Sequence, residues 1–304
     1  MSRGTEVVDR LKGPVVPVNI CFADDYSVDY EPMCRYVDWL CEQRVPVILL
    51  TYGSSEFSVL SSEEIWKLTE LFARTVAGRA LFVTSTGYWS IEECREFLRH
   101  ADAVGADAVK VQINPWLGQE REVLVGYFDA IRGAAGIPLL LWGAWPDPYP
   151  IATVRELATR DEVVGIKNDG DPFYAYYDLL RATAEESFAV ISGGQMRNFM
   201  LGYPLGGAAY LCTVAPFRPD LALRFYGHLQ VGEMDAAWAM VERYEDRWLQ
   251  LAIKHGWLES LKVAMELHGL VPNARLGRPR PSLEGAAREA VQATVREVFG
   301  DPDA

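Results

Sequence analysis

Short apolar runs alternate with longer amphipathic stretches along the chain from Val15 to about Gly232. The short runs are rich in β-branched residues and typical of buried parallel strands, whereas the longer stretches show helical spacing. Strands are predicted at Val15–Phe22, Val45–Thr51, Ala80–Ser85, Ala108–Ile113, Pro138–Trp142, Val163–Lys167, Phe188–Ser192 and Ala208–Thr213. Helices are predicted at Tyr30–Gln43, Ser62–Ala77, Ser90–Val104, Glu120–Gly133, Pro150–Thr159, Pro172–Ala184, Gln195–Leu201 and Pro219–Val231. Eight such pairs predict an α/β fold, a closed (β/α)8 barrel with its functional site at the carboxyl ends of the strands.

Beyond Gly232 the pattern changes, because the strand–helix alternation stops there. Glu233–Lys254, Trp257–Leu267 and Ser282–Phe299 are predicted as three further helices. The proline-containing link Gly277–Pro281 would form a rigid connector between the last two. We therefore expect a barrel domain over residues 1–232, which holds the active site, and a C-terminal helical extension over residues 233–304.

Composition narrows the class of protein. The chain has 304 residues, is 50% hydrophobic, and carries a formal charge of -13 that is spread along its length. Nucleic-acid binding is not expected, because phosphates need clustered Lys and Arg. Neither a secretory signal nor a run of roughly 18 apolar residues is visible, so we expect no membrane span. The five cysteines are odd in number and have no CxxC spacing, which is typical of reduced thiols in a cytoplasmic protein.

No cofactor or metal is expected from the sequence. The four histidines, His100, His228, His255 and His268, fall in or beside predicted helices and form no HxH or HxxxH pair. Neither a GxGxxG nor a GxxxxGK[ST] motif is present.

One lysine carries the most chemical information. Lys167 stands at the end of the apolar run that begins at Val163, where a buried strand would deliver its amine into a pocket. An apolar site disfavours ammonium and leaves a free amine that can attack a carbonyl and form a Schiff base. The alternative is an ordinary lysine at a strand end, facing solvent.

The chain resembles the dihydrodipicolinate synthase and N-acetylneuraminate lyase family over nearly its whole length. The segments that carry the resemblance are Gly13–Val18, Asp25–Tyr30, Val37–Leu40, Leu60–Glu64, Gly105–Val109, Val164–Lys167, Ile191–Gly193 and Leu261–Glu266. The resemblance implies a (β/α)8 Schiff-base lyase, in which Lys167 condenses with the keto group of pyruvate or another 2-oxo acid. It also implies a homo-oligomer, either a tetramer or a dimer.

The resemblance also suggests how a carboxylate is held. The family has a Gly-Ser/Thr-Thr-Gly-Glu turn after strand two, and this chain has Tyr52-Gly53-Ser54-Ser55-Glu56 there. Gly53, Ser54 and Ser55 would hold the carboxylate through hydroxyl and amide groups, although a plain Gly-Ser turn would also explain the composition. Gly193 and Leu211, at the ends of the last two predicted strands, are further candidates for substrate binding.

The chain departs from the family in its proton relay. Members usually carry a tyrosine just after strand four, but this chain has Asn114-Pro115-Trp116-Leu117. An indole donates a hydrogen bond but cannot exchange protons near neutral pH. The arginine of dihydrodipicolinate synthases after strand five is also missing from the segment Trp142–Tyr149, so lysine biosynthesis is not expected.

Several residues could replace the relay. Tyr52, Tyr88 and Tyr149 each follow a predicted strand, and Asp169 stands two residues beyond Lys167. Each has the simpler alternative of a loop residue with a packing role. Lys110, inside predicted strand four, is either a second barrel amine that lowers the pKa of the first or a lysine turned outward to water.

Tryptophans are frequent near the strand ends. Trp89, Trp116, Trp142 and Trp145 would line the mouth of the site, and Trp116 and Trp142 are candidates for substrate contact. Flat apolar side chains favour a substrate that is partly apolar, although tryptophans also fill barrels and cover subunit interfaces.

The sequence thus predicts a Schiff-base lyase that adds, cleaves or dehydrates a 2-oxo acid through Lys167. Two alternatives stay open: a non-catalytic or regulatory barrel that binds a keto acid without turnover, and a hydratase or decarboxylase that uses the same lysine.

Overall fold

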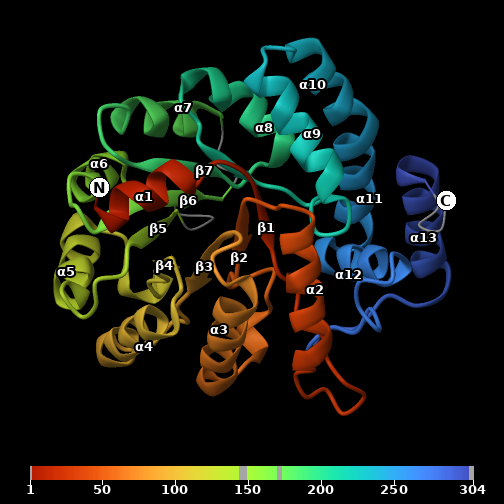
Figure 1. Cartoon of the computed structure of the whole chain (residues 1–304), viewed down its shortest axis with the longest axis horizontal. Coiled ribbons are helices and arrows are strands. Elements are labelled where there is room, and N and C mark those ends of the chain that lie inside the picture. The colour runs from red at the N-terminus through yellow and green to blue at the C-terminus, as the bar shows by residue number, and fades with distance from the viewer. Residues whose placement is uncertain (1, 144–148, 170–172, 301–304) are drawn as a thin grey trace.

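The computed structural model describes residues 2–143, 149–169 and 173–300. Eight parallel strands close into a barrel in the order of the sequence, which confirms the predicted (β/α)8 fold (Figure 1). The strands are β1 Gly13–Pro17, β2 Val47–Leu49, β3 Leu81–Ser85, β4 Ala108–Lys110, β5 Leu139–Gly143, β6 Val163–Asn168, β7 Ala189–Ser192 and β8 Ala209–Leu211. The barrel closes between the first and last strands, where Val15 pairs with Leu211.

Helices surround the barrel and continue beyond it (Figure 1). They are α1 Arg3–Arg10, α2 Tyr30–Glu42, α3 Ser62–Val76, α4 Ile91–Val104, α5 Arg121–Ile131, α6 Ile151–Ala158, α7 Phe173–Ala182, α8 Gln195–Gly202, α9 Pro219–Gln230, α10 Met234–Met240, α11 Arg247–His255, α12 Trp257–Leu267 and α13 Gly285–Phe299. Short 3-10 turns lie in the loops after β2 and β4, η1 Phe57–Val59 and η2 Pro115–Leu117, and a third, η3 Tyr203–Leu205, directly follows α8. The start of α3 is fixed by a capping box between Ser61 and Glu64.

Some of the strands, β1, β2, β4 and β8, end earlier than predicted. β4 stops at Lys110 rather than Ile113, and β1 stops at Pro17 rather than Phe22. Single hydrogen bonds continue past both ends, from Val18 N to Leu49 O at 2.9 Å and from Val111 N to Leu140 O at 2.9 Å. The ladder breaks up because the chains turn into loops at this end of the barrel, and this is where side chains reach the site.

Two apolar layers position the barrel residues. One lies inside the barrel and includes Val15, Leu81 and Ala108, and the other lies between the strands and the outer helices and includes Val109. Side chains two residues apart on a strand face the same side, so Lys110 points to the barrel interior as Ala108 does. The alternative of an outward-facing Lys110 is therefore wrong, since only 1% of this residue is exposed.

Helix α1 was not predicted. Two apolar side chains of this segment are buried in the interior layer, Val7 and, at the cap, Leu11, and the partly buried Val8 packs against that layer. Two buried apolar residues in so short a segment give too weak a periodic signal to predict a helix. The helix is held further by an ion pair of 3.1 Å between Arg10 and Asp107, which precedes β4.

The predicted helix Glu233–Lys254 is interrupted. Residues Val241–Asp246 form a π-helical segment, η4, between α10 and α11. The wider turn places Glu245 in the interior, where its carboxylate accepts hydrogen bonds from Met196 N at 2.6 Å and Arg197 N at 2.9 Å, at the start of α8. Burial raises the pKa of Glu245 to about 7.

No helix within the described ranges is long and apolar enough to cross a membrane. The five cysteine thiols are free, and all except the half-buried Cys34 are buried.

Candidate active site

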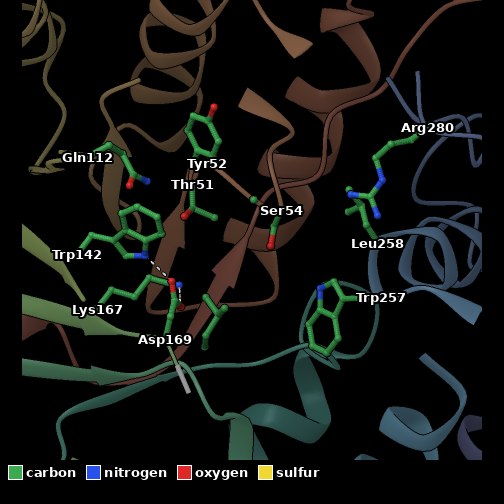
Figure 2. A pocket seen from close by; sticks show the side chains of 12 residues that line it. Thr51, Tyr52, Ser54, Gln112, Trp142, Lys167, Asp169, Trp257, Leu258 and Arg280 are labelled. Carbon is green, nitrogen blue, oxygen red and sulfur yellow. Dashed lines mark hydrogen bonds and ion pairs between the residues drawn. The ribbon is translucent and has the colours of Figure 1, made fainter. Parts of the chain in front are cut away.

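A pocket of about 350 Å³ opens at the carboxyl ends of the strands, which is large enough for a small organic acid (Figure 2). Its walls are formed by Thr51, Tyr52, Gly53, Ser54, Gln112, Trp142, Lys167, Asp169, Leu211, Trp257, Leu258 and Arg280. The strand residues form the inner wall. Trp257, Leu258 and Arg280, from α12 and the link before α13, lie on the opposite side.

Lys167 extends from β6 into this pocket. The residue is 5% exposed. Burial, with a smaller contribution from the positive charge of Lys110, lowers the pKa of the Lys167 amine well below its ordinary value. Its Nζ also contacts a carboxylate oxygen of Asp169, which acts in the opposite direction because it favours ammonium. The sequence-based expectation of a buried strand-end amine therefore matches its position.

Asp169 is held on both sides. One oxygen meets the amine of Lys167, and the other accepts a hydrogen bond from Nε1 of Trp142 on β5. Gly193, at the end of β7, packs directly behind it. A Cβ at this glycine would lie 2.3 Å from Asn168 O and 2.8 Å from the Asp169 Cα, so only glycine allows this approach. Gly193 thus supports Asp169 and does not line the pocket.

The turn after β2 contributes Tyr52, Gly53 and Ser54 to the pocket. Within the described ranges the Ser54 hydroxyl has no hydrogen-bond partner, nor do the amides of Gly53 and Ser54. Ser55 is placed differently from the expectation. Its hydroxyl is fully buried, donates to Val18 O at 2.6 Å and accepts from Thr51 N at 3.1 Å, so it braces the turn and does not reach the pocket.

A buried ion pair ties this turn to the C-terminal helices. Glu56 has a left-handed backbone with φ of 50°, and its side chain lies 2.6 Å from Lys262 of α12. Gly277 N donates to the same carboxylate at 2.9 Å. The Lys262 amine also donates to Ile20 O at 2.5 Å and Arg275 O at 2.7 Å. The loop that lines the pocket is therefore fastened to the extension.

Two buried polar side chains of the β4 segment lack partners. Lys110 Nζ and both amide atoms of Gln112 make no hydrogen bond to the described part of the chain. Gln112 lines the pocket, and the Lys110 ammonium lies 5.1 Å from the centre of the Trp142 ring. Buried polar groups without partners are rare in folded proteins, so these atoms point to a polar ligand or water in this region.

The three candidate tyrosines separate in space. Tyr52 lines the pocket, and Tyr88 packs behind it with ring centres 4.4 Å apart. Burial raises the pKa of Tyr52 and raises that of Tyr88 to about 12. Tyr149 lies instead in a second, apolar cavity against Ile166 and Leu179, and burial raises its pKa. Tyr149 is thus not brought to the site.

Of the three predicted mouth tryptophans that the structure describes, only Trp142 lines the pocket. Trp116, on η2, is 96% exposed and outside it. Trp89 packs against Phe97 with ring centres 5.0 Å apart. Trp145 lies outside the described residues.

Five pocket residues were missed: Thr51, Gln112, Trp257, Leu258 and Arg280. Gln112 could have been grouped with Lys110, because it lies two residues further along the chain and so on the same side of an extended segment, but the inward direction of both was known only from the barrel. The three residues of the extension had no local signal, since their place depends on how α12 packs on the barrel.

Metal ligation finds no support in the part of the chain that is described. No group of three or more His, Cys, Asp or Glu side chains there could hold a metal ion.

Comparisons with known proteins agree with this geometry. A family model described as the dihydrodipicolinate synthetase family matches residues 10–298. An uncharacterized DapA-like lyase of Pyrococcus furiosus is 26% identical over 292 residues, covering 95% of this chain and 96% of that relative. Dihydrodipicolinate synthase from Oceanobacillus iheyensis superposes with a TM-score of 0.87 at 21% identity, over 97% of this chain and 98% of the other. YagE, a prophage protein from E. coli K12 solved in complex with pyruvate, superposes with a TM-score of 0.85 at 21% identity, over 95% and 98% of the two chains.

Proposed function

The chain belongs to the dihydrodipicolinate synthetase family, and on this premise we propose that it is a lyase that forms a Schiff base between Lys167 and a 2-oxo acid. The observation that carries the proposal is a single buried amine on the pocket wall, whose pKa burial lowers. A neutral amine can add to a carbonyl, and the iminium that follows serves as an electron sink for aldol or dehydration chemistry. The superposing YagE structure holds pyruvate, a ligand of this class.

The substrate carboxylate would lie against the turn after β2. Gly53 and Ser54 offer two amides and a hydroxyl that have no partner within the described ranges. Such a group of donors suits an anion. Gln112, on the other side of the pocket, offers an amide to a second polar group of the substrate.

Asp169 is the acid–base group that we assign. It touches the Lys167 amine, whereas the raised pKa of Tyr52 makes its phenol a poor proton donor near neutral pH. The missing tyrosine after strand four would thus be replaced by a carboxylate directly after β6.

The pocket also favours a substrate that is partly apolar. Trp142, Leu211, Trp257 and Leu258 supply apolar wall, and Arg280 supplies one cation at the rim. A 2-oxo acid with an apolar or singly charged tail fits this surface better than a polyhydroxylated sugar acid. Assembly as a homodimer or homotetramer stays a prediction, which light scattering would test.

The test is intact mass spectrometry after borohydride reduction with pyruvate and a panel of larger 2-oxo acids. We expect one adduct per chain on the wild type, located on Lys167 by peptide mapping, and none on Lys167→Ala. The exposed Lys12→Ala serves as a matched control and should keep the adduct.

Turnover is then assayed with the acid that traps best and a set of aldehydes. Adduct and product together support the lyase, while an adduct without product from any aldehyde supports the non-catalytic keto-acid-binding barrel. A wild type that forms no adduct with any acid contradicts the Schiff-base proposal altogether.

A further inference from the structure

A second buried lysine lies in the barrel beneath the pocket. Lys110 is 1% exposed, and its Nζ has no hydrogen-bond partner within the described ranges. Its ammonium faces the Trp142 ring at 5.1 Å, a distance at which the negative face of the ring favours a cation. Burial lowers the pKa of the Lys110 amine to about 7.

This arrangement is unusual for a lysine that only fills space. A lysine stem is long enough to bring its amine to water, and a buried ammonium without partners is costly. Lys262 in the same protein shows what a structural lysine has, since its amine meets a carboxylate and two carbonyl oxygens. Lys110 has only the face of an indole.

Three charged side chains, those of Lys110, Lys167 and Asp169, lie around Trp142. Lys167 is on β6, next to the β5 strand that carries Trp142, and Asp169 directly follows the end of β6. Ser85 pairs with Lys110 in the register of β3 and is neutral, and Tyr88, which lies 6.1 Å from the Trp142 ring, stays protonated because its pKa is about 12. Among the described residues around Trp142, the charged groups are therefore the amines of Lys110 and Lys167 and the carboxylate of Asp169.

The balance of these three charges decides the state of Lys167. A lysine paired with Asp169 alone would hold its proton, and an ammonium has no lone pair for attack on a carbonyl. A second cation in the same low-dielectric interior opposes that proton, because two ammonium groups beside one carboxylate repel each other. Protonation of one amine therefore disfavours protonation of the other.

Building on the proposed function, we propose that Lys110 is a positioning residue of this site, whose buried charge offsets the Asp169 carboxylate and leaves the Lys167 amine free to attack the substrate carbonyl. In that step the amine lone pair forms the C–N bond while the C=O π bond breaks, and one proton moves from the nitrogen to the oxygen to give a neutral carbinolamine. The carbinolamine then takes up one proton and loses water, which leaves a singly charged iminium.

The experiment is the pH dependence of adduct formation with pyruvate, trapped by cyanoborohydride and measured by intact mass. Lys110→Met removes the charge at similar volume, and Lys110→Arg keeps it. We expect the midpoint of the profile to move upward by at least one pH unit in Lys110→Met and to stay at or below the wild-type value in Lys110→Arg. Superimposable profiles of the wild type and Lys110→Met would overturn the inference.

The double variant Lys110→Met/Asp169→Asn separates an electrostatic effect from general damage. If Lys110 acts by offsetting Asp169, removal of both charges returns the midpoint toward the wild type, although the rate is lower. A midpoint that stays at the Lys110→Met value speaks against the inference. Circular dichroism checks the fold of each variant. If Lys110→Met does not fold, the wild-type profile alone still tests the inference, because a midpoint near the ordinary lysine pKa of 10.5 would contradict it.

The two proposals fail differently. A wild type that forms no adduct at any pH ends the proposed function. A wild-type adduct with an unshifted Lys110→Met profile ends only the role of Lys110.

Discussion

Two buried lysines, Lys167 and Lys262, are each paired with a carboxylate but have different surroundings. Lys262 lies between α12 and the turn after β2, and its amine is surrounded by Glu56, two backbone carbonyls and the ring of Phe22 at 4.8 Å. Lys167 lies on the pocket wall with one carboxylate partner. The Glu56 side chain is 3% exposed, whereas that of Asp169 is 24% exposed.

The difference separates structure from chemistry. An amine whose hydrogens are all taken up by fixed oxygens is held in one state and one place. An amine with one partner, a neighbouring cation and an open cavity can lose its proton and gain a new bond. Both lysines are buried and both have lowered pKa values, so burial alone does not identify a reactive lysine.

The largest effect on stability is expected at Lys262. Lys262→Met leaves Glu56 buried without its cation, which should lower the free energy of unfolding by about 3–5 kcal/mol. Lys167→Met should change it by less than about 1 kcal/mol, because Asp169 still faces the pocket and its water. Urea unfolding followed by tryptophan fluorescence measures both values.

A double variant serves as the control for this prediction. Lys262→Met/Glu56→Gln removes both charges and should recover part of the loss. Equal destabilisation by Lys262→Met and Lys167→Met would break the distinction between the two lysines.

Glu245 offers a third buried charge, with a pH dependence of defined sign. Its pKa is raised from 4.5 to about 7 in the folded protein, so the folded state binds the proton more tightly than the unfolded state. Its contribution to stability is therefore full below pH 4.5 and is lost as the pH rises toward 7. Between pH 5 and 7.5 the wild type should lose about 1–3 kcal/mol relative to Glu245→Gln.

The measurement is urea unfolding of both proteins at several pH values. The difference between the two curves cancels the titration of all other groups. A difference that is constant with pH would show that Glu245 has the same pKa in the folded and the unfolded protein, which contradicts this prediction.

The smallest effect is expected at Arg280, which tests whether the C-terminal extension contacts the substrate in addition to holding the turn after β2. Arg280 lines the pocket rim and is held by Glu259 at 2.7 Å. For a 2-oxo acid with a second carboxylate, Arg280→Met should raise the half-saturating concentration for adduct formation about tenfold, or roughly 1.4 kcal/mol. Pyruvate, which is too short to reach the rim, should be unaffected. Equal weakening for both acids would mean that Arg280 acts on the loop rather than on the substrate.

Local sequence patterns determine much of the fold of this protein and the positions of several site residues. The alternation of apolar runs and amphipathic stretches predicts the barrel, because strand and helix periods are properties of short segments. The same patterns place Lys167 at a strand end, and the turn at Gly53 and Ser54 at the mouth. The two-residue period of a strand places Lys110 and Gln112 on the same side of the chain. Whether that side faces the barrel interior or the outer helices could not be decided before the barrel register was known.

Tertiary structure decided the rest. Whether Ser55 braces the turn or faces the pocket depends on a hydrogen bond to Val18, a residue 37 positions earlier in the chain. The ion pair of Glu56 and Lys262 and the pocket walls from Trp257 and Arg280 bring together segments about 200 residues apart, which no local period encodes. The sequence determined which side chains stand at the strand ends, and only the packing of the extension on the barrel decided which of them share a pocket, because contact across such separations depends on the closed fold.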